Sequence, residues 1–148
     1  MEGVIGGFLG GVLLLLLLFV GVVASIMTNI EFRRAAGSPL CKPGSKYDCL
    51  RVYSLPQAWV MGFHLSQLAP AYYIILFILG ILALAFNHGP SLKLLAFLAW
   101  ECAIIAPYMI YLMVRVAGAV CLYCLVMHAV SIIAALMTYR VLLSGLGL

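Results

Sequence analysis

The sequence predicts an all-α membrane protein, a bundle of four transmembrane helices with one long loop and a short interfacial helix after helix 1. Of the 148 residues, 67% are hydrophobic and only 8% are charged, whereas soluble domains average about 25% charged residues. Four apolar runs divide the chain, and each is long enough for a hydrocarbon core of about 30 Å. The polar sequence is too short for a separate soluble domain, so we expect a single domain over residues 1–148.

Residues 3–27 form the first predicted crossing, which includes six consecutive leucines from Leu13 to Leu18. A cleaved signal peptide fits this run poorly. Glu2 stands where a basic residue is usual, and the apolar stretch exceeds the typical length of about 7–15 residues. We therefore expect a transmembrane helix that stays in the protein.

Residues 28–64 form the predicted active-site loop, the only long polar segment of the chain. Pro39 and Pro43 lie in its first half and oppose a long helix there. The second half is partly apolar, and we predict a short interfacial helix or re-entrant lid with Tyr53 and Trp59 at the level of the lipid headgroups. An ordinary amphipathic linker is the simpler alternative.

The remaining crossings are predicted at residues 65–86, 92–114 and 120–143. Their short connections make consecutive helices antiparallel neighbours, as in a four-helix bundle. Counting crossings along the chain places the long loop and the start of the fourth helix at the same face of the membrane.

Four of the five cysteines form two close pairs, one in the loop (Cys41 and Cys49) and one at the head of the fourth helix (Cys121 and Cys124). Thiols at positions i and i+3 share one helical face, within reach of a disulfide. The free N–H groups and positive dipole end of a first helical turn favour thiolate over thiol. Two such pairs at one face predict an electron relay by thiol–disulfide exchange.

Other interpretations of the cysteines stay open from spacing alone. Two structural disulfides fit an outward-facing protein, although a C-x-x-C disulfide closes a small loop and adds little stability. A four-cysteine zinc site is a further alternative, but the spacing from Cys41 to Cys49 is wider than usual, and we expect no metal. Cys102 stands alone in an apolar run and is expected to be an inert core thiol.

Two ionisable residues fall within predicted crossings, where such groups are functional candidates. His128 continues the stripe of Cys121 and Cys124 at i+7, where it can donate a hydrogen bond or carry a proton beside a quinone oxygen. A hydrogen bond to a backbone carbonyl is the structural alternative. Glu101 lies near the middle of the third crossing, and it supports an alternative function as a small proton-coupled membrane transporter with structural cysteines.

The two cysteine pairs resemble those of the vitamin K epoxide reductase family. The pattern Cys41-x7-Cys49 after the first crossing, followed by Cys121-Leu-Tyr-Cys124 at the head of the fourth, is specific to that family, and the resemblance spans nearly the whole chain. Further matching segments are Cys49-Leu-Arg-Val-Tyr-Ser-Leu-Pro56, Gly62-Phe63, Tyr108-Met109 and Gly118-Ala119-Val120-Cys121.

The resemblance implies a membrane thiol oxidase, an enzyme that makes disulfides in a thioredoxin-like partner and reduces a membrane quinone of the ubiquinone or menaquinone type. It implies that Cys124 faces the quinone, that Cys121 exchanges with Cys49, and that Cys41 meets the partner. The sequence carries no fused thioredoxin-like domain, so we expect the electron donor to be a separate protein. The basic residues form no run, and no nucleic-acid partner is expected.

The candidate quinone contacts are His128, Ser54, Leu55, Tyr72 and Tyr108. Leu55 occupies the place where the family commonly has Ser or Thr, and Ser54 precedes it. His128 stands where vertebrate members carry Tyr, which favours simple quinone reduction over epoxide reduction.

The membrane orientation receives two opposed predictions. The active-site face carries six basic residues, whereas the opposite face carries only Lys93 and Arg140. The positive-inside rule therefore favours a cytoplasmic active site. The family resemblance implies an outward one, where disulfides normally persist. The basic residues of the active-site face are Arg33, Arg34, Lys42, Lys46, Arg51 and Arg115.

Overall fold

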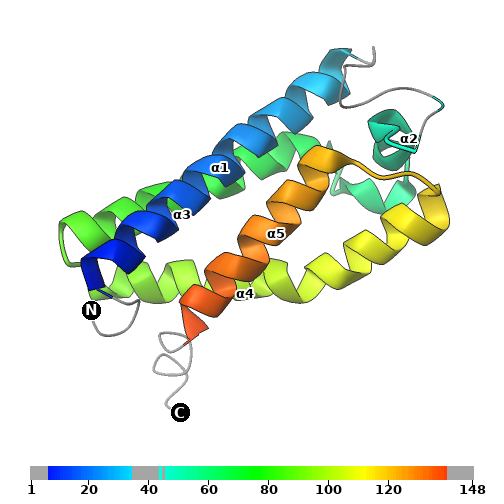
Figure 1. The fold of residues 1–148 in the computed structure, drawn as a ribbon. Helices are drawn as coiled ribbons and strands as arrows, with labels where there is room; N and C mark the ends of the chain where they lie inside the picture. Colours follow the sequence, from blue (N-terminus) through cyan, green and yellow to red (C-terminus); the bar gives the residue numbers. More distant parts are fainter. Residues whose placement is uncertain (1–6, 35–43, 45, 140–148) are drawn as a thin grey trace.

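The computed structural model describes residues 7–34, 44 and 46–139, and it shows a bundle of four helices (Figure 1). The helix α1 packs against α3 and α5, and α4 packs against the same two helices. This arrangement confirms the predicted all-α membrane bundle. The long helices are α1 (Gly7–Arg34), α3 (Leu65–Ala85), α4 (Gly89–Tyr111) and α5 (Leu122–Met137).

Among the described residues, three segments are long and apolar enough to cross a membrane, and α5 is a shorter apolar helix of 16 residues. The fourth crossing is predicted to start at about Val120, and α5 begins two residues later, at Leu122, because the chain is extended at Cys121. Residues 140–143 of that predicted crossing lie outside the described residues. The three long spans are Leu9–Arg33, Leu65–Ala85 and Gly89–Ala117.

The first helix is longer than predicted, since α1 continues past Met27 to Arg34. Its last turns carry polar residues, but Thr28 and Glu31 are buried against the rest of the protein. Tertiary packing thus extends this helix into a segment that its composition assigned to the loop. The active-site loop is correspondingly shorter at its start.

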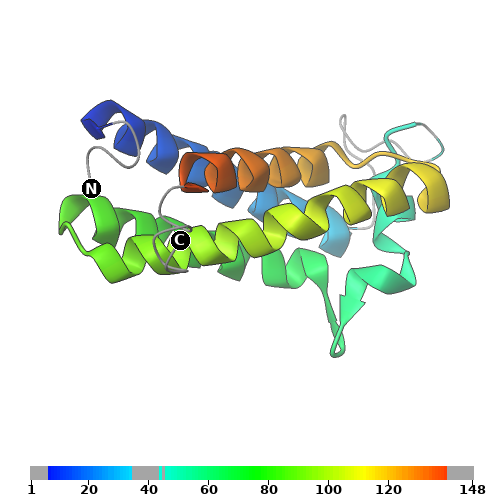
Figure 2. The same ribbon diagram turned by 90° about the horizontal axis from the view of Figure 1, so that it is seen from below.

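The predicted interfacial helix is replaced by several short elements. The helix α2 (Cys49–Tyr53) is followed by a 3-10 turn η1 (Pro56–Ala58) and a hairpin of β1 (Trp59–Val60) and β2 (Phe63–His64). The hairpin projects sideways from the bundle (Figure 2). We call η1 and the hairpin, residues 56–64, the lid.

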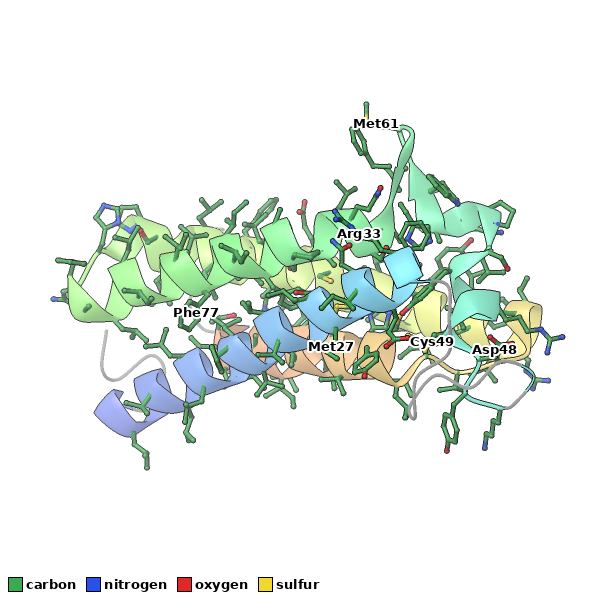
Figure 3. All side chains as sticks on the ribbon, turned by 90° about the horizontal axis from the view of Figure 1, so that it is seen from above. Met27, Arg33, Asp48, Cys49, Met61 and Phe77 are labelled. Carbon is green, nitrogen blue, oxygen red and sulfur yellow. The ribbon has the colours of Figure 1, made fainter. Side chains whose placement is uncertain are left out.

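The lid hairpin turns at Met61 and Gly62, which have φ values of 51° and 87°. Two successive positive φ values define the tight turn that matches strand twist, and glycine adopts them without strain. Figure 3 shows Met61 at the tip, away from the helices, where it is 94% exposed. Trp59 is half exposed, whereas Tyr53 is buried within the protein and is therefore shielded from the lipid headgroups.

Histidine side chains begin two of the helices. His64 Nδ1 accepts a hydrogen bond from the Ser66 amide at 3.1 Å, and His88 Nδ1 accepts one from the Ser91 amide at 3.2 Å. Each bond satisfies one of the free N–H groups at a helix start. The His88 cap and the proline in the first turn start α4 at Gly89, earlier than the predicted residue 92.

The third crossing ends in a π-helix, η2 (Leu112–Ala117), and therefore runs past the predicted end at residue 114. Gly118 then adopts a left-handed conformation with φ of 67°, which a residue without Cβ tolerates best, and its amide bonds Met113 O. Next, the Val120 amide bonds Lys46 O at 2.8 Å. These contacts tie the start of α5 to the loop before α2.

Candidate active site

The two cysteines of the C-x-x-C occupy different environments at the start of α5. Cys121 is the N-cap residue, and its sulfur accepts a hydrogen bond from the Cys124 amide at 3.3 Å. Cys121 is fully buried, whereas Cys124 is half-buried. The helix start therefore stabilises a thiolate at Cys121. From residue spacing alone, the same stabilisation is predicted for both cysteines of the first turn.

The second loop cysteine lies next to this pair. Cys49 begins α2, is buried, and is disulfide-bonded. It shares one buried apolar cluster with Tyr53, Met113 and Cys121. The predicted meeting of a loop cysteine with the helix pair is therefore present in the structure, while Cys41 lies outside the described residues.

Two further groups contact Cys121. Its amide donates a hydrogen bond to Met113 Sδ at 3.1 Å, and the Tyr53 hydroxyl lies 3.5 Å from its sulfur. Hydrogen bonding to Cys124 and Tyr53 lowers the pKa of the Cys121 thiol, although burial opposes this. The site thus favours thiolate at the cysteine that lies beside Cys49.

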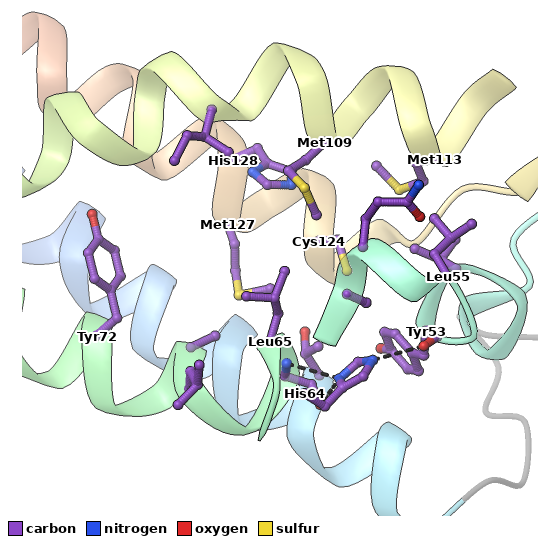
Figure 4. A pocket seen from close by; sticks show the side chains of 18 of the residues that line it. Tyr53, Leu55, His64, Leu65, Tyr72, Met109, Met113, Cys124, Met127 and His128 are labelled. Carbon is purple, nitrogen blue, oxygen red and sulfur yellow. Dashed lines mark hydrogen bonds between the residues drawn. The ribbon is translucent and has the colours of Figure 1, made fainter. Parts of the chain in front are cut away.

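The lid joins this site through His64 (Figure 4). Because His64 Nδ1 accepts from the Ser66 amide, Nε2 carries the proton and donates it to Tyr53 O at 2.9 Å. The ring stacks on Phe32, with centroids 4.1 Å apart, and makes a T-shaped contact with Trp59, with centroids 5.1 Å apart. Burial lowers the pKa of His64, so the imidazole is held neutral.

A cavity of about 340 Å³ lies beneath the lid and between the helices. This volume is within the range of small-molecule sites, roughly 300–1,000 Å³. Its wall is apolar with a few polar groups, which include Cys124 and His128 from α5 and Tyr72 from α3. Figure 4 shows Cys124 and His128 on one side of this cavity and Tyr72 on another.

Three of the candidate quinone contacts line the cavity, namely Leu55, Tyr72 and His128. The Tyr72 hydroxyl donates to Leu98 O at 2.7 Å, so that hydroxyl is already engaged. The His128 Nδ1 atom is buried and has no hydrogen-bond partner among the described residues. The structural alternative for His128, a bond to a backbone carbonyl, is therefore not what this nitrogen makes.

The other two candidates, Ser54 and Tyr108, do not line the cavity. The Ser54 hydroxyl donates to Arg51 O at 2.8 Å in an exposed position just after α2. Tyr108 is 54% exposed on the outer side of α4, and Met109 lines the cavity in its place. Helical rotation by one residue accounts for this difference.

Cys102 and Glu101 are also neighbours in sequence of which only one lines the cavity. Cys102 is not a fully buried core residue, since it lines the cavity and accepts a hydrogen bond from Ser131 Oγ at 3.3 Å. Glu101 is exposed on the outer face of α4 and is absent from the described cavity wall. The cavity therefore gives the transporter interpretation no support. Within the described ranges, no cluster of three His, Cys, Asp or Glu side chains is arranged to hold a metal ion.

Several site residues escaped prediction, and Tyr53 is the clearest of them. It lies four residues after Cys49, hence on the same face of a helix, so helical spacing was the signal that could have found it. His64 and Met113 gave no such signal, because their roles depend on a hairpin and a π-helix that pattern alone does not predict.

Two cysteines lie at the start of a helix beside an apolar cavity, and a third cysteine, Cys49, packs against them. This arrangement is typical of a membrane oxidoreductase. Comparison with protein families agrees. Residues 12–139 match the vitamin K epoxide reductase family, and the chain belongs to that family. The match covers most of the chain and confirms the resemblance drawn from the cysteine pairs. A search of curated proteins gives no match to this chain.

Proposed function

We propose that the protein is a membrane thiol oxidase. It passes electrons from a separate thioredoxin-like partner through two cysteine pairs to a membrane quinone. One observation carries this proposal: Cys49 and Cys121 share a buried cluster, while Cys124 lines the apolar cavity. The relay then has an entry, a point of exchange and an exit in the order that electron flow requires.

In the first half of the cycle, a partner thiolate attacks the loop disulfide, and the partner leaves oxidised while Cys41 and Cys49 become thiols. The Cys49 thiolate then attacks Cys121 in the Cys121–Cys124 disulfide. A bond forms between Cys49 and Cys121, and Cys124 is released as a thiolate that faces the cavity.

In the second half, Cys41 attacks Cys49, the loop disulfide forms again, and Cys121 is released as a thiolate. The helix pair now holds two electrons. These electrons leave through Cys124 when the Cys121–Cys124 disulfide closes again, and two protons accompany them.

A quinone, when bound, supplies the two-electron acceptor for this step. The residues present fit such a group, because the cavity is apolar and of suitable volume. Its wall includes His128, whose buried Nδ1 atom has no hydrogen-bond partner among the described residues. An Nδ1–H group there can donate to a carbonyl oxygen and can hold a proton for the reduced product. Tyr72 contributes to the cavity wall from α3, and Leu55 contributes to it from the position just before the lid.

The orientation in the membrane belongs to the same proposal, and we place the active site on the cytoplasmic face. The support is the charge bias: Arg51 and Arg115 lie at the active-site end, whereas Lys93 lies at the opposite end of α4. A membrane-impermeant thiol reagent on intact cells, after mild reduction, should leave Cys41 and Cys49 unlabelled until the membrane is opened. Labelling of either cysteine in intact cells contradicts this orientation.

Trapping the exchange intermediate tests the order of the relay. In Cys41→Ser, Cys49 has no resolving partner in the loop, so the mixed disulfide Cys49–Cys121 should accumulate. Mass mapping of a non-reduced digest detects this link, and Cys121→Ser in the same background is the control that removes it. Finding Cys49 linked only to Cys124, or to nothing, contradicts the proposed order.

A further inference from the structure

Tyr53 contacts the relay at its central sulfur. Its hydroxyl lies 3.5 Å from Cys121 Sγ, and both side chains are buried. The Cys124 amide approaches the same sulfur at 3.3 Å. A hydrogen-bonding hydroxyl from α2 and an amide from α5 therefore converge on one sulfur atom.

The direction of the bond follows from the chemistry of the two groups. A thiolate can only accept hydrogen bonds. Burial, with Cys121 and Cys124 nearby, raises the pKa of Tyr53, so the phenol keeps its proton. The Tyr53 hydroxyl is thus the donor whenever Cys121 is ionised.

The surroundings fix Tyr53 in this position. Its ring makes T-shaped contacts with Phe32 and His64, with ring centroids 6.0 Å and 5.7 Å apart. Its carbonyl accepts the 2.9 Å bond from His64 Nε2. The lid and the end of α1 therefore hold the hydroxyl on the sulfur, and reorganisation at the moment of reaction is small.

We propose that Tyr53 is a catalytic hydrogen-bond donor that stabilises the Cys121 thiolate during thiol–disulfide exchange. This inference rests on the proposed function. When Cys41 attacks Cys49, the Cys41–Cys49 bond forms, the Cys49–Cys121 bond breaks, and the electron pair stays on the Cys121 sulfur. Tyr53 donates to that sulfur without losing its proton. The same bond holds Cys121 as the nucleophile that later closes the disulfide with Cys124.

The change Tyr53→Phe removes the hydroxyl and keeps the ring in its packing. The other titratable groups around the contact stay in place: Cys124 on α5 and the buried Glu31 on α1. Cys49 on α2 becomes a thiol when the chain is reduced, but it is present in both Tyr53→Phe and the wild-type protein, and Met113 on η2 carries no proton. A difference between the two proteins therefore reports the hydrogen bond.

Nuclear magnetic resonance of the reduced full chain in micelles, with carbon-13 at the cysteine Cβ atoms, measures the ionisation of each thiol. The Cys121 resonance is assigned with Cys121→Ser. In Tyr53→Phe, the pH of half-ionisation of Cys121 should rise by about 1, because a hydrogen bond to a charged group is lost. The matched control Tyr111→Phe removes a hydroxyl from an exposed position on α4 and should leave the Cys121 titration unchanged.

Turnover supplies the second readout. Dithiol-dependent quinone reduction by Tyr53→Phe should fall about tenfold near neutral pH and recover as the pH rises. If the Cys121 titration is the same in Tyr53→Phe as in the wild type, and the wild type turns over normally, the inference about Tyr53 is overturned and the proposed function is not. A wild-type protein without turnover overturns the proposed function instead, since the titration needs neither partner nor quinone.

A substitution that strengthens the hydrogen bond, and does not remove it, tests the inference if Tyr53→Phe does not fold. Fluorotyrosine at position 53 is a more acidic and therefore stronger donor of nearly the same shape. It should lower the pH at which Cys121 half-ionises. A titration that does not move, or moves upward, overturns the inference.

Discussion

His64 and His88 begin their helices with the same local hydrogen bonds, at opposite ends of the bundle. Each Nδ1 atom accepts from a serine amide, and each serine hydroxyl lies within 2.7 Å of that nitrogen. His88 is exposed, but His64 is 1% exposed, stacks on Phe32 and donates to Tyr53 O. His88 thus only caps a helix, whereas His64 caps a helix and also connects the lid to the active site.

This comparison predicts unequal costs for the two caps. His64→Ala should lower the free energy of unfolding by roughly 3 kcal/mol, because it removes a cap and leaves the buried Tyr53 carbonyl without its donor. His88→Ala should cost about 1 kcal/mol, the usual value of a cap. Thermal unfolding of the two purified variants in one detergent measures the difference. Equal costs would show that the lid contacts of His64 add nothing.

Two glycines of α1 extend the comparison to the helix contacts. A Cβ atom at Gly21 meets ring carbons of Tyr73 at 2.6 and 2.8 Å. That ring cannot retreat easily, because its hydroxyl bonds Met127 O and Ser131 Oγ. Gly21→Ala should therefore destabilise the fold by roughly 2 kcal/mol.

A Cβ atom added at Gly11 would contact only the end of the Leu84 side chain, at 3.1 Å. This flexible group can shift, and alanine favours a helix by about 1 kcal/mol over glycine. Gly11→Ala should be neutral or stabilising in the same unfolding experiment. A larger cost at Gly11 than at Gly21 contradicts the packing described for Tyr73.

Acid should affect the His64 end through its cap. The pKa of His64 is lowered by burial, so the unfolded chain takes up a proton at higher pH than the folded protein does. The free energy of unfolding should fall as the pH drops below about 6.5, the ordinary histidine value. His64→Asn keeps a capping side chain that does not titrate, and it should show a weaker loss between neutral and mildly acid pH. An equal pH dependence in both proteins contradicts a neutral, buried His64.

The bundle could be predicted from sequence because hydrophobic length fixes transmembrane helices and short loops fix their order. The cysteine pairs could be predicted because close spacing brings two thiols onto one helical face. The Tyr53–Cys121 contact could not, since it joins residues 68 positions apart through packing of α2 on η2. Ser54 and Tyr108 lie outside the described cavity wall for the same reason, because residue order does not fix the rotation of a short helix or the side of α4.

The central claim is that electrons pass from a dithiol through Cys121 and Cys124 to a quinone, and the absorbance of a quinone tests it most directly. Purified protein with a reduced thioredoxin-like partner should reduce the quinone. Cys124→Ser should abolish this turnover because no disulfide can close in the helix pair, whereas Cys102→Ala keeps both pairs and should still turn over. Near wild-type turnover by a folded Cys124→Ser protein would contradict the claim and leave the cysteines structural.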